Sequence, residues 1–239
     1  MNKIFIRNIY TFITLVFVSS SALAENSELS IADSLFNNQK YTEAYETYEK
    51  IFNENQASPA MLTRMAFIQE GLGNYANALY YLNLYYLQSS DRDALTKMRE
   101  IAEEHNLTGY EYSDFKFFEN FIRKYQMEIS FCLMAFSLFV LGYSFRKTKK
   151  EERPAISLGV QLIALLALLA INNELFIKEK GIINQDQSIL MSGPSAGAEP
   201  IESIGLGNKV TILETDELWS KIIWHDSEAY IRNKNVRKL

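Results

Sequence analysis

Two long apolar segments, separated by a short basic stretch, constrain this chain more than any other feature of its sequence. They span about residues 129–145 and 155–171, and neither contains a charged residue. At 1.5 Å per residue, a helix of about 17 residues is roughly 26 Å long, and a few flanking residues extend it to the hydrocarbon thickness of about 30 Å. The pattern predicts transmembrane helices at 127–145 and 155–177. The alternative, a pair of buried core helices, needs a large surrounding domain that the rest of the chain can hardly supply.

The stretch between the two segments, 146–154, indicates which side of the membrane the rest of the chain occupies. Short loops rich in lysine and arginine stay in the cytoplasm. The stretch carries five such residues: Arg146, Lys147, Lys149, Lys150 and Arg153. We therefore expect a cytoplasmic loop, with the soluble parts before and after the hairpin on the opposite side.

The amino end has the three parts of a secretory signal peptide. Lys3 and Arg7 precede an apolar stretch at 9–18, and Ala22-Leu23-Ala24 forms an A-x-A cleavage site. We expect a signal peptide at 1–24 or, without cleavage, an anchor with its basic end inside. Either form exports the region that follows, so this signal and the basic loop predict the same topology.

The exported region at 25–107 repeats itself after 34 residues, which is the period of the tetratricopeptide repeat. In that repeat two antiparallel helices cross closely, so small residues are needed at the crossing and repeats stack on one another. The predicted packing positions are Ala32, Tyr41 and Ala44 in the first copy, and Ala66, Gly73, Tyr75 and Ala78 in the second. Gln39 replaces the turn glycine in the first copy. A further helix from Asp91 to His105 is expected to cap the array.

Tetratricopeptide arrays hold peptides in a concave groove. The usual inward positions correspond to Asp33, Asn37, Thr63, Phe67 and Glu70. The alternative is that these side chains form the solvated faces of a structural spacer.

An aromatic segment at 108–126 directly precedes the first apolar run. A helix capped by Ser113 or Asp114 places four apolar side chains on one face. These are Phe115, Phe118, Ile122 and Tyr125. Two interpretations remain open: a helix lying in the membrane interface, or a stripe that closes the repeat stack.

Short β-rich runs after the second apolar segment predict a small barrel at 180–239. The expected strands are 187–191, 210–213, 218–224, 229–231 and 235–239. Their order resembles a bacterial SH3-like domain through Pro194-Ser195, Gly207-Asn208-Lys209-Val210, Trp219-Ser220-Lys221-Ile222 and Ala229-Tyr230-Ile231, the last departing from the Gly-Trp-Ile of that family. Trp219, Trp224 and Tyr230 are a candidate ligand surface, although we expect Trp219 to belong to the core.

No catalytic, cofactor or metal motif is found in the sequence. His105 and His225 lack the spacing of metal ligands, and Asp226 and Glu228 beside His225 are too few to argue for a site. Cys132, the single cysteine, lies in an apolar run and is expected to act as a small hydrophobe. A net charge of −5 argues against nucleic-acid binding. The sequence thus predicts a protein that is not an enzyme.

Taken together, the order of parts predicts a multidomain α+β protein with tetratricopeptide-like hairpins, a transmembrane hairpin and a C-terminal SH3-like β-barrel. This order, with the stretch from Thr108 to Phe115, resembles the repeat-plus-SH3 protein family of the aerotolerance (Bat) operon in Bacteroidetes-type bacteria. The resemblance implies a multi-pass inner-membrane protein with both soluble parts in the periplasm. It also implies a scaffold that acts beside von Willebrand A-domain membrane proteins and a MoxR-type ATPase. The alternative function is binding of peptidoglycan or cell-wall peptides through the SH3-like part.

Overall fold

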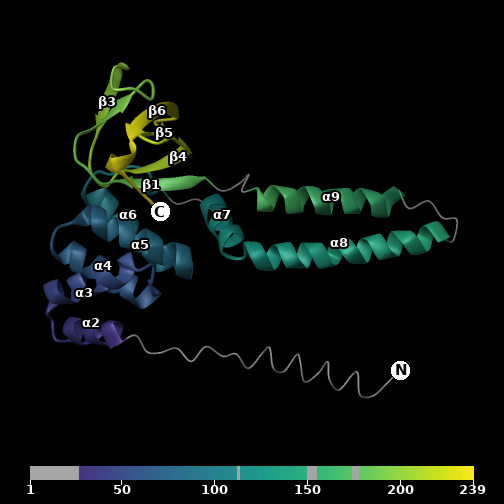
Figure 1. The fold of residues 1–239 in the computed structure, drawn as a ribbon, viewed down its shortest axis with the longest axis horizontal. Coiled ribbons are helices and arrows are strands. Elements are labelled where there is room, and N and C mark those ends of the chain that lie inside the picture. The colour runs from purple at the N-terminus through teal and green to yellow at the C-terminus, as the bar shows by residue number, and fades with distance from the viewer. Residues whose placement is uncertain (1–26, 112–113, 150–154, 174–177) are drawn as a thin grey trace. The chain divides into compact units, whose positions relative to one another are not determined.

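The fold is mixed α+β, as the sequence predicts. The computed structural model describes residues 27–111, 114–149, 155–173 and 178–239 (Figure 1). Over these ranges it contains eight α-helices, one short 3₁₀-helix and one antiparallel sheet of seven strands.

The chain divides into two compact units, Met1–Ala57 and Ser58–Leu239. The first unit contains one described helical hairpin, and the second contains the remaining helices together with the sheet. The division falls between the two repeat copies, so the second copy belongs to the same unit as the β strands. Three predicted features fall outside the described residues: the signal peptide at 1–24, and Lys150 and Arg153 of the basic stretch.

The first unit is a hairpin of α2 (Ser27–Asn37) and α3 (Tyr41–Asn53). Ala32 and Ala44 are fully buried, as a close helix crossing requires. Tyr48 is also fully buried, and its hydroxyl donates a hydrogen bond to the Asp33 carboxylate at 2.7 Å.

Three helices open the second unit. They are α4 (Pro59–Gly71), α5 (Tyr75–Ser89) and α6 (Arg92–Glu104). Ser58 caps α4 by accepting a hydrogen bond from Met61 N, and Asp91 caps α6 in the same way through Asp93 N. The α6 helix agrees with the helix expected between Asp91 and His105.

The turn that ends α2 and the turn that ends α4 have the same backbone geometry, 34 residues apart. Gln39 and Gly73 are both left-handed, with φ of 61° and 75°. In each turn this residue and the next donate their N–H groups to carbonyls in the last turn of the helix. The repeat therefore extends from sequence to backbone, with glutamine in the first copy at a position that favours glycine.

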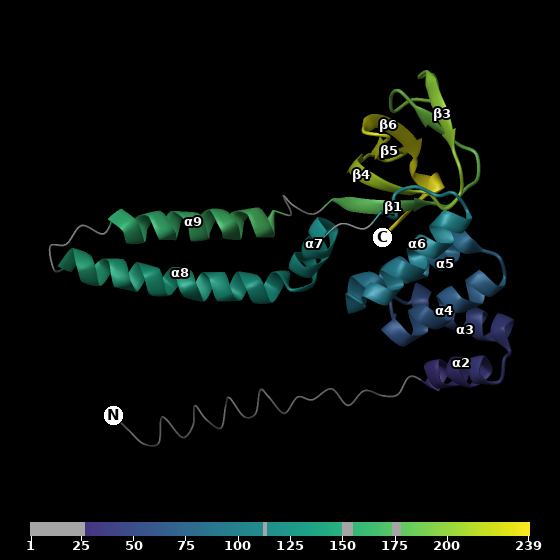
Figure 2. The ribbon, with the colours of Figure 1, turned by 180° about the vertical axis from the view of Figure 1, so that it is seen from behind.

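Two helices are long and apolar enough to cross a membrane. These are α8 (Gln126–Lys149) and α9 (Ala155–Asn172), which lie side by side and antiparallel (Figures 1 and 2). Only 17% and 11% of the residues in their most apolar windows are buried, so they are not core helices of the described fold.

A seam of polar and small residues joins α8 to α9. Ser144 donates to Ser157 at 2.8 Å, and Gln161 donates to Ser137 at 2.6 Å. Ala164 is also buried on this seam side of α9. Small residues permit the close approach of two helices, and the two hydrogen bonds add to the contact.

The predicted basic loop begins later than expected. Arg146 and Lys147 lie within the last turns of α8, which continues to Lys149. The reason is that arginine and lysine are good helix formers and no glycine or proline interrupts this part of the chain. At the other end of the hairpin, α9 ends at Asn172, whereas the prediction extended to 177.

The sheet follows the hairpin, in the order β3-β2-β6-β5-β4-β1-β7. Its strands are β1 (Glu179–Ile183), β2 (Ser188–Met191), β3 (Pro200–Ile204), β4 (Lys209–Thr215), β5 (Trp219–Trp224), β6 (Ser227–Arg232) and β7 (Val236–Lys238), with the 3₁₀-helix at Asn233–Asn235. All seven strands contribute at least one side chain to a single buried cluster, so the sheet is curled around one core.

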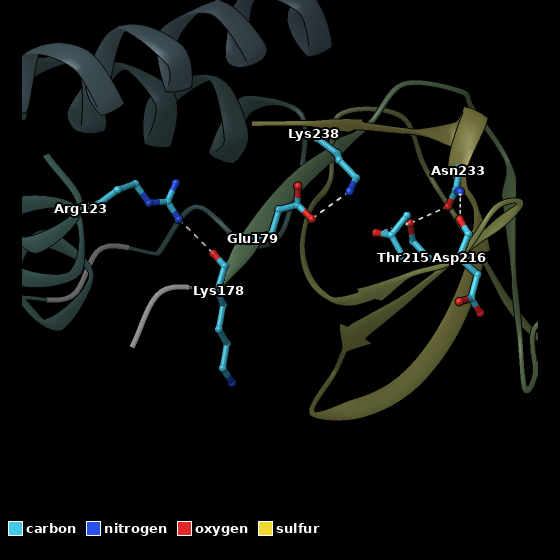
Figure 3. A network of polar contacts seen from close by, with 8 residues as sticks. Arg123, Lys178, Glu179, Thr215, Asp216, Asn233 and Lys238 are labelled. Carbon is cyan, nitrogen blue, oxygen red and sulfur yellow. Dashed lines mark hydrogen bonds and ion pairs between the residues drawn. The ribbon is translucent and has the colours of Figure 1, made fainter. Parts of the chain in front are cut away.

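The core is aliphatic, and hydrogen bonds of the Asn233 side chain stabilise one end of the sheet. Asn233 accepts a hydrogen bond from Ser220 at 2.7 Å and donates to the Asp216 carbonyl at 2.6 Å (Figure 3). This side chain ties the β4–β5 turn to the end of β6. In β1, between β4 and the edge strand β7, Gly181 leaves no room for a side chain, because an added Cβ would lie 2.4 Å from Val236 Cγ1.

The left-handed glutamine predicts a stabilising substitution. Gln39→Gly should raise the free energy of unfolding of the first hairpin by about 0.5–1 kcal/mol, because a left-handed residue with a side chain costs about 1–2 kcal/mol and the flexibility of glycine returns part of this gain. Denaturant unfolding of the detergent-solubilised protein measures this free energy. The rate of proteolytic cleavage within 27–57 reports on the first hairpin.

The matched control is Gly73→Gln in the second repeat. An added Cβ there meets no atom within 4 Å, so only the backbone strain is introduced. This variant should be less stable by a similar amount, and equal stability of both variants and the wild type would contradict the interpretation.

Candidate functional site

The segment that follows α6 is hydrogen-bonded to the start of β4. The Asn208 side chain accepts from the backbone N–H of Thr108 at 2.9 Å and from its hydroxyl at 3.1 Å. Lys209 N donates to the Thr108 carbonyl at 3.1 Å. Helices and sheet therefore meet through backbone groups as well as side chains, and we call this contact the junction.

Two glycines permit the close approach at the junction. Gly109 and Gly207 both have positive φ, of 92° and 85°. An added Cβ at Gly109 would lie 2.2 Å from the Lys209 carbonyl oxygen, and one at Gly207 would lie 2.9 Å from the Tyr75 ring. Both conformation and space thus require glycine here.

Tyr110 is buried at the centre of the junction. Its hydroxyl donates to the Gly207 carbonyl at 2.7 Å. Burial raises the pKa of the Tyr110 hydroxyl far above its ordinary value, because the phenolate would lose its hydration. The ammonium of Lys209 lies 5.6 Å from the Tyr110 ring centre and donates to the Asn83 side chain of α5.

A second contact joins β7 to α5. The Arg237 guanidinium lies 3.7 Å from the centre of the Tyr80 ring, which is within cation–π range. On the same side, Tyr75 stacks on His105 with ring centres 4.1 Å apart. His105 therefore packs against an aromatic ring and does not approach a set of metal-ligating side chains in the described part of the chain.

Helix α7 (Asp114–Lys124) is held to both the helices and the sheet by its polar side. Glu119 is 8% exposed, accepts from Lys178 N at 3.2 Å and forms an ion pair with Lys180 at 3.0 Å. Arg123 donates to the Lys178 carbonyl at 3.3 Å (Figure 3). Asn120 donates to Tyr86 O and Ser90 Oγ at 3.4 and 3.3 Å. Because Lys178 follows α9 and α7 precedes α8, these bonds tie the two ends of the apolar hairpin together.

The other side of α7 is aromatic and exposed. Phe118, Phe121 and Tyr125 are 56%, 43% and 38% exposed. This is the reverse of a helix that packs in water, whose apolar side faces the core. Of the four residues predicted to share a face, Phe118 and Tyr125 are exposed and Ile122 is partly buried, while the Phe115 side chain lies outside the described residues.

A cavity of about 130 Å³ lies beside the junction, between α5, α6, α7 and the sheet. Its polar lining includes Asn83, Asn120, Arg123, Lys180 and Lys209. Most of these groups already bond to protein atoms, as described above, whereas Asn120 Oδ1 has no hydrogen-bond partner among the described residues. The lining is thus made of the residues that join the helices to the sheet.

The predicted peptide-groove residues are mostly engaged within their own units. In the first unit, Asp33 accepts from Tyr48, and Asn37 is the exposed last residue of α2. In the second unit, Thr63 donates to the Ala60 carbonyl and Glu70 pairs with Lys97 at 2.6 Å.

Phe67 differs from the other predicted groove residues because it is 55% exposed. Among the predicted packing positions, Ala66 and Ala78 are buried, and Tyr75 packs at the junction. Tyr41 is 36% exposed and contacts Phe36 edge to face.

The aromatic residues of the sheet divide between its two faces. Along β5 the buried positions are Ser220 and Ile222, so Trp224 is in phase with them and packs against the core. Trp219 points to the opposite face, 5.6 Å from the Arg232 guanidinium. The expectation that Trp219 belongs to the core is therefore wrong, because side chains on a strand alternate and the core takes the even-numbered residues here.

Tyr230 lies on the same outer face as Trp219. It pairs with Lys221 across the β5–β6 ladder, next to the pair of Trp219 with Arg232. Lys221 also bonds to Glu228 at 2.8 Å, which raises the pKa of that lysine. The predicted three-residue surface is thus a two-residue surface, flanked by cations.

No family model matches this sequence, and no curated protein matches it.

The junction predicts a specific loss of stability. Asn208→Ala should lower the free energy of unfolding by about 1–3 kcal/mol, because it leaves the Thr108 N–H without its acceptor in a partly buried place. Thermal unfolding of the full-length protein in detergent measures this. The matched control is Asn184→Ala, at an exposed asparagine directly after β1, which should change stability by less than about 0.5 kcal/mol.

Tyr110 predicts a dependence of stability on alkaline pH. Its folded pKa is raised, so its contribution is fully present below the unfolded value of about 10 and is lost as pH rises further, since only the unfolded chain then releases the proton. Tyr110→Phe removes the ionisable group. The stability advantage of the wild type over this variant should shrink between pH 9 and 11, by up to about 1.4 kcal/mol per pH unit above 10. A pH-independent difference would mean that the hydroxyl is accessible to water in the folded protein.

Proposed function

We propose that this protein is a non-enzymatic scaffold of the bacterial inner membrane. In this proposal α8 and α9 span the bilayer, and the helices and the sheet lie together on the periplasmic side. The observation that carries it is the set of bonds from Glu119 and Arg123 to Lys178, which joins the chain entering the hairpin to the chain leaving it. A hairpin fixed at its base can hold a binding surface at a constant distance from the membrane.

The exposed aromatic side of α7 supports membrane attachment. Exposed Phe118, Phe121 and Tyr125 are unfavourable in water but suited to the membrane interface, where aromatic side chains are enriched. This exposure favours a helix that lies in the membrane interface. It does not favour an aromatic stripe that closes the repeat stack. Buried Glu119 and Asn120 on the opposite side give the helix a protein-facing surface at the same time.

The two soluble parts fit modules that hold partners. The 34-residue recurrence of sequence and turn geometry supports tetratricopeptide repeats in α2–α5, and the curled sheet supports an SH3-like domain. The family resemblance adds von Willebrand A-domain membrane proteins and a MoxR-type ATPase as partners. Exposed Phe67 is the residue of the predicted groove best placed to contact a partner.

The alternative function is binding of peptidoglycan or its peptides by the sheet. Its specific support is the outer face that carries Trp219 and Tyr230 beside Arg232 and Lys221. Aromatic rings can stack on sugars or on peptide groups, and the cations can bind carboxylates.

Crosslinking in native membranes distinguishes the two functions. A scaffold should yield crosslinks to other membrane proteins, and Phe67→Ala should reduce them while Ile189→Ala, at an equally exposed residue of the sheet, should not. Recovery of the protein alone under efficient labelling contradicts the scaffold. Retention of the full-length protein on purified sacculi, lost in Trp219→Ala, would support the alternative.

The topology has its own test. Reporter fusions after Ser90 and at Leu239 should report export, and one after Lys149 should report the cytoplasm, because the basic stretch is retained there. A cytoplasmic signal at Leu239 would contradict the proposed arrangement.

A further inference from the structure

A groove of about 520 Å³ lies where α7 meets the apolar hairpin, and we call it the interfacial groove. Arg123 and Lys124 line one part of it, and Phe131 and Met134 of α8 with Leu168 of α9 line another. Phe131 and Met134 are 64% and 53% exposed. The groove thus joins a basic end to an apolar trough.

The two cations at the basic end retain donors for a ligand. Arg123 donates one bond to the Lys178 carbonyl, and a guanidinium has five N–H donors. Lys124 donates one bond to the Ser89 carbonyl, out of three available, and lies 5.5 Å from the Tyr125 ring centre. Neither forms an ion pair with a carboxylate among the described residues of the chain.

Between the two cations and Phe131, the groove is lined by Gln126, Met127 and Ser130. The Ser130 hydroxyl oxygen is buried, so it does not face a ligand in the groove. The lining therefore changes from cationic at the end of α7 to mainly apolar along α8, as a phospholipid changes from phosphate to acyl chain.

We propose that the interfacial groove binds one anionic phospholipid of the non-cytoplasmic leaflet. Its phosphate lies against Arg123 and Lys124, and one acyl chain follows Phe131, Met134 and Leu168. An anionic headgroup is favoured over a zwitterionic one, because the latter brings its own cation close to the positive charges of Arg123 and Lys124. The inference rests on the proposed membrane-spanning hairpin and adds to it a defined lipid partner.

Lipid binding in the interfacial groove also affects the base of the hairpin. Arg123 bonds to Lys178 at the base of the hairpin and lines the groove as well. A phosphate bound there neutralises the guanidinium beside the end of α7 and holds α7, α8 and the chain after α9 in one arrangement. Lipid binding should therefore stabilise the base of the hairpin.

The test compares phosphatidylglycerol with phosphatidylcholine of the same acyl chains. Native mass spectrometry of the full-length protein in a mild detergent counts bound lipid as each lipid is titrated. We expect one retained phosphatidylglycerol with at least about tenfold tighter binding than phosphatidylcholine, since each basic residue near an anionic lipid contributes about 1 kcal/mol. Lys124→Gln should remove several-fold of this preference, and Arg123→Gln with Lys124→Gln should remove most of it.

The matched control is Arg92→Gln with Arg99→Gln, which removes two exposed cations of α6 that do not line the groove. This variant should keep the preference for phosphatidylglycerol. Equal binding of both lipids by the wild type, or equal loss in both double variants, overturns the inference. Extraction of membranes with alkaline carbonate tests the membrane-spanning hairpin independently of the lipid site. A protein that stays in the membrane pellet but shows no lipid preference refutes the lipid site alone.

Discussion

The hydrogen bonds between Thr108 and the pair Asn208-Lys209 are the interaction on which the rest of the second unit depends. They join residues about 100 positions apart, with the whole apolar hairpin between them. Ordering so long a connection costs conformational entropy, so the contact must be held by several cooperating groups. The buried Tyr110 hydroxyl, the two glycines with positive φ and the Arg237–Tyr80 stacking are those groups.

This junction gives the proposed scaffold its rigidity. Without it, the sheet would be a separate module connected to the membrane by a short segment. With it, the polar side of α7 can bond to α5 and to Lys178 at once, and its aromatic side is left facing outward. The aromatic side of α7 is therefore exposed because the protein partners of this helix lie on its polar side. In the proposed function, such a helix lies between protein and lipid.

Features with a local cause could be predicted from the sequence, and those set by long-range pairing could not. The 34-residue repeat, the start of α6 at Asp91 and the two apolar helices depend on periodicity and capping within a few turns. Strands β1 and β3 were not predicted. The former is short and bonds to β4 and β7 far along the chain, and the latter is an exposed edge strand without alternation.

The candidate functional residues also divide into those predictable from local sequence and those set by long-range pairing. Trp219, expected in the core, faces outward on β5, and Trp224 packs against the core instead, because strand register is set by pairing with distant strands. The junction itself left only weak traces in the sequence, namely Gly109 and Gly207 in turn-forming contexts. The basic pair Arg123-Lys124 was visible, but nothing local revealed a groove beside it.

Amide hydrogen exchange at the junction tests the central claim most directly. The account predicts that the amides of Thr108 and Lys209 exchange as slowly as those of central β5 in the full-length protein, because both are bonded within one cooperative unit. Exchange of these two amides at the rate of an exposed turn, with β5 still protected, would contradict a single body of helices and sheet.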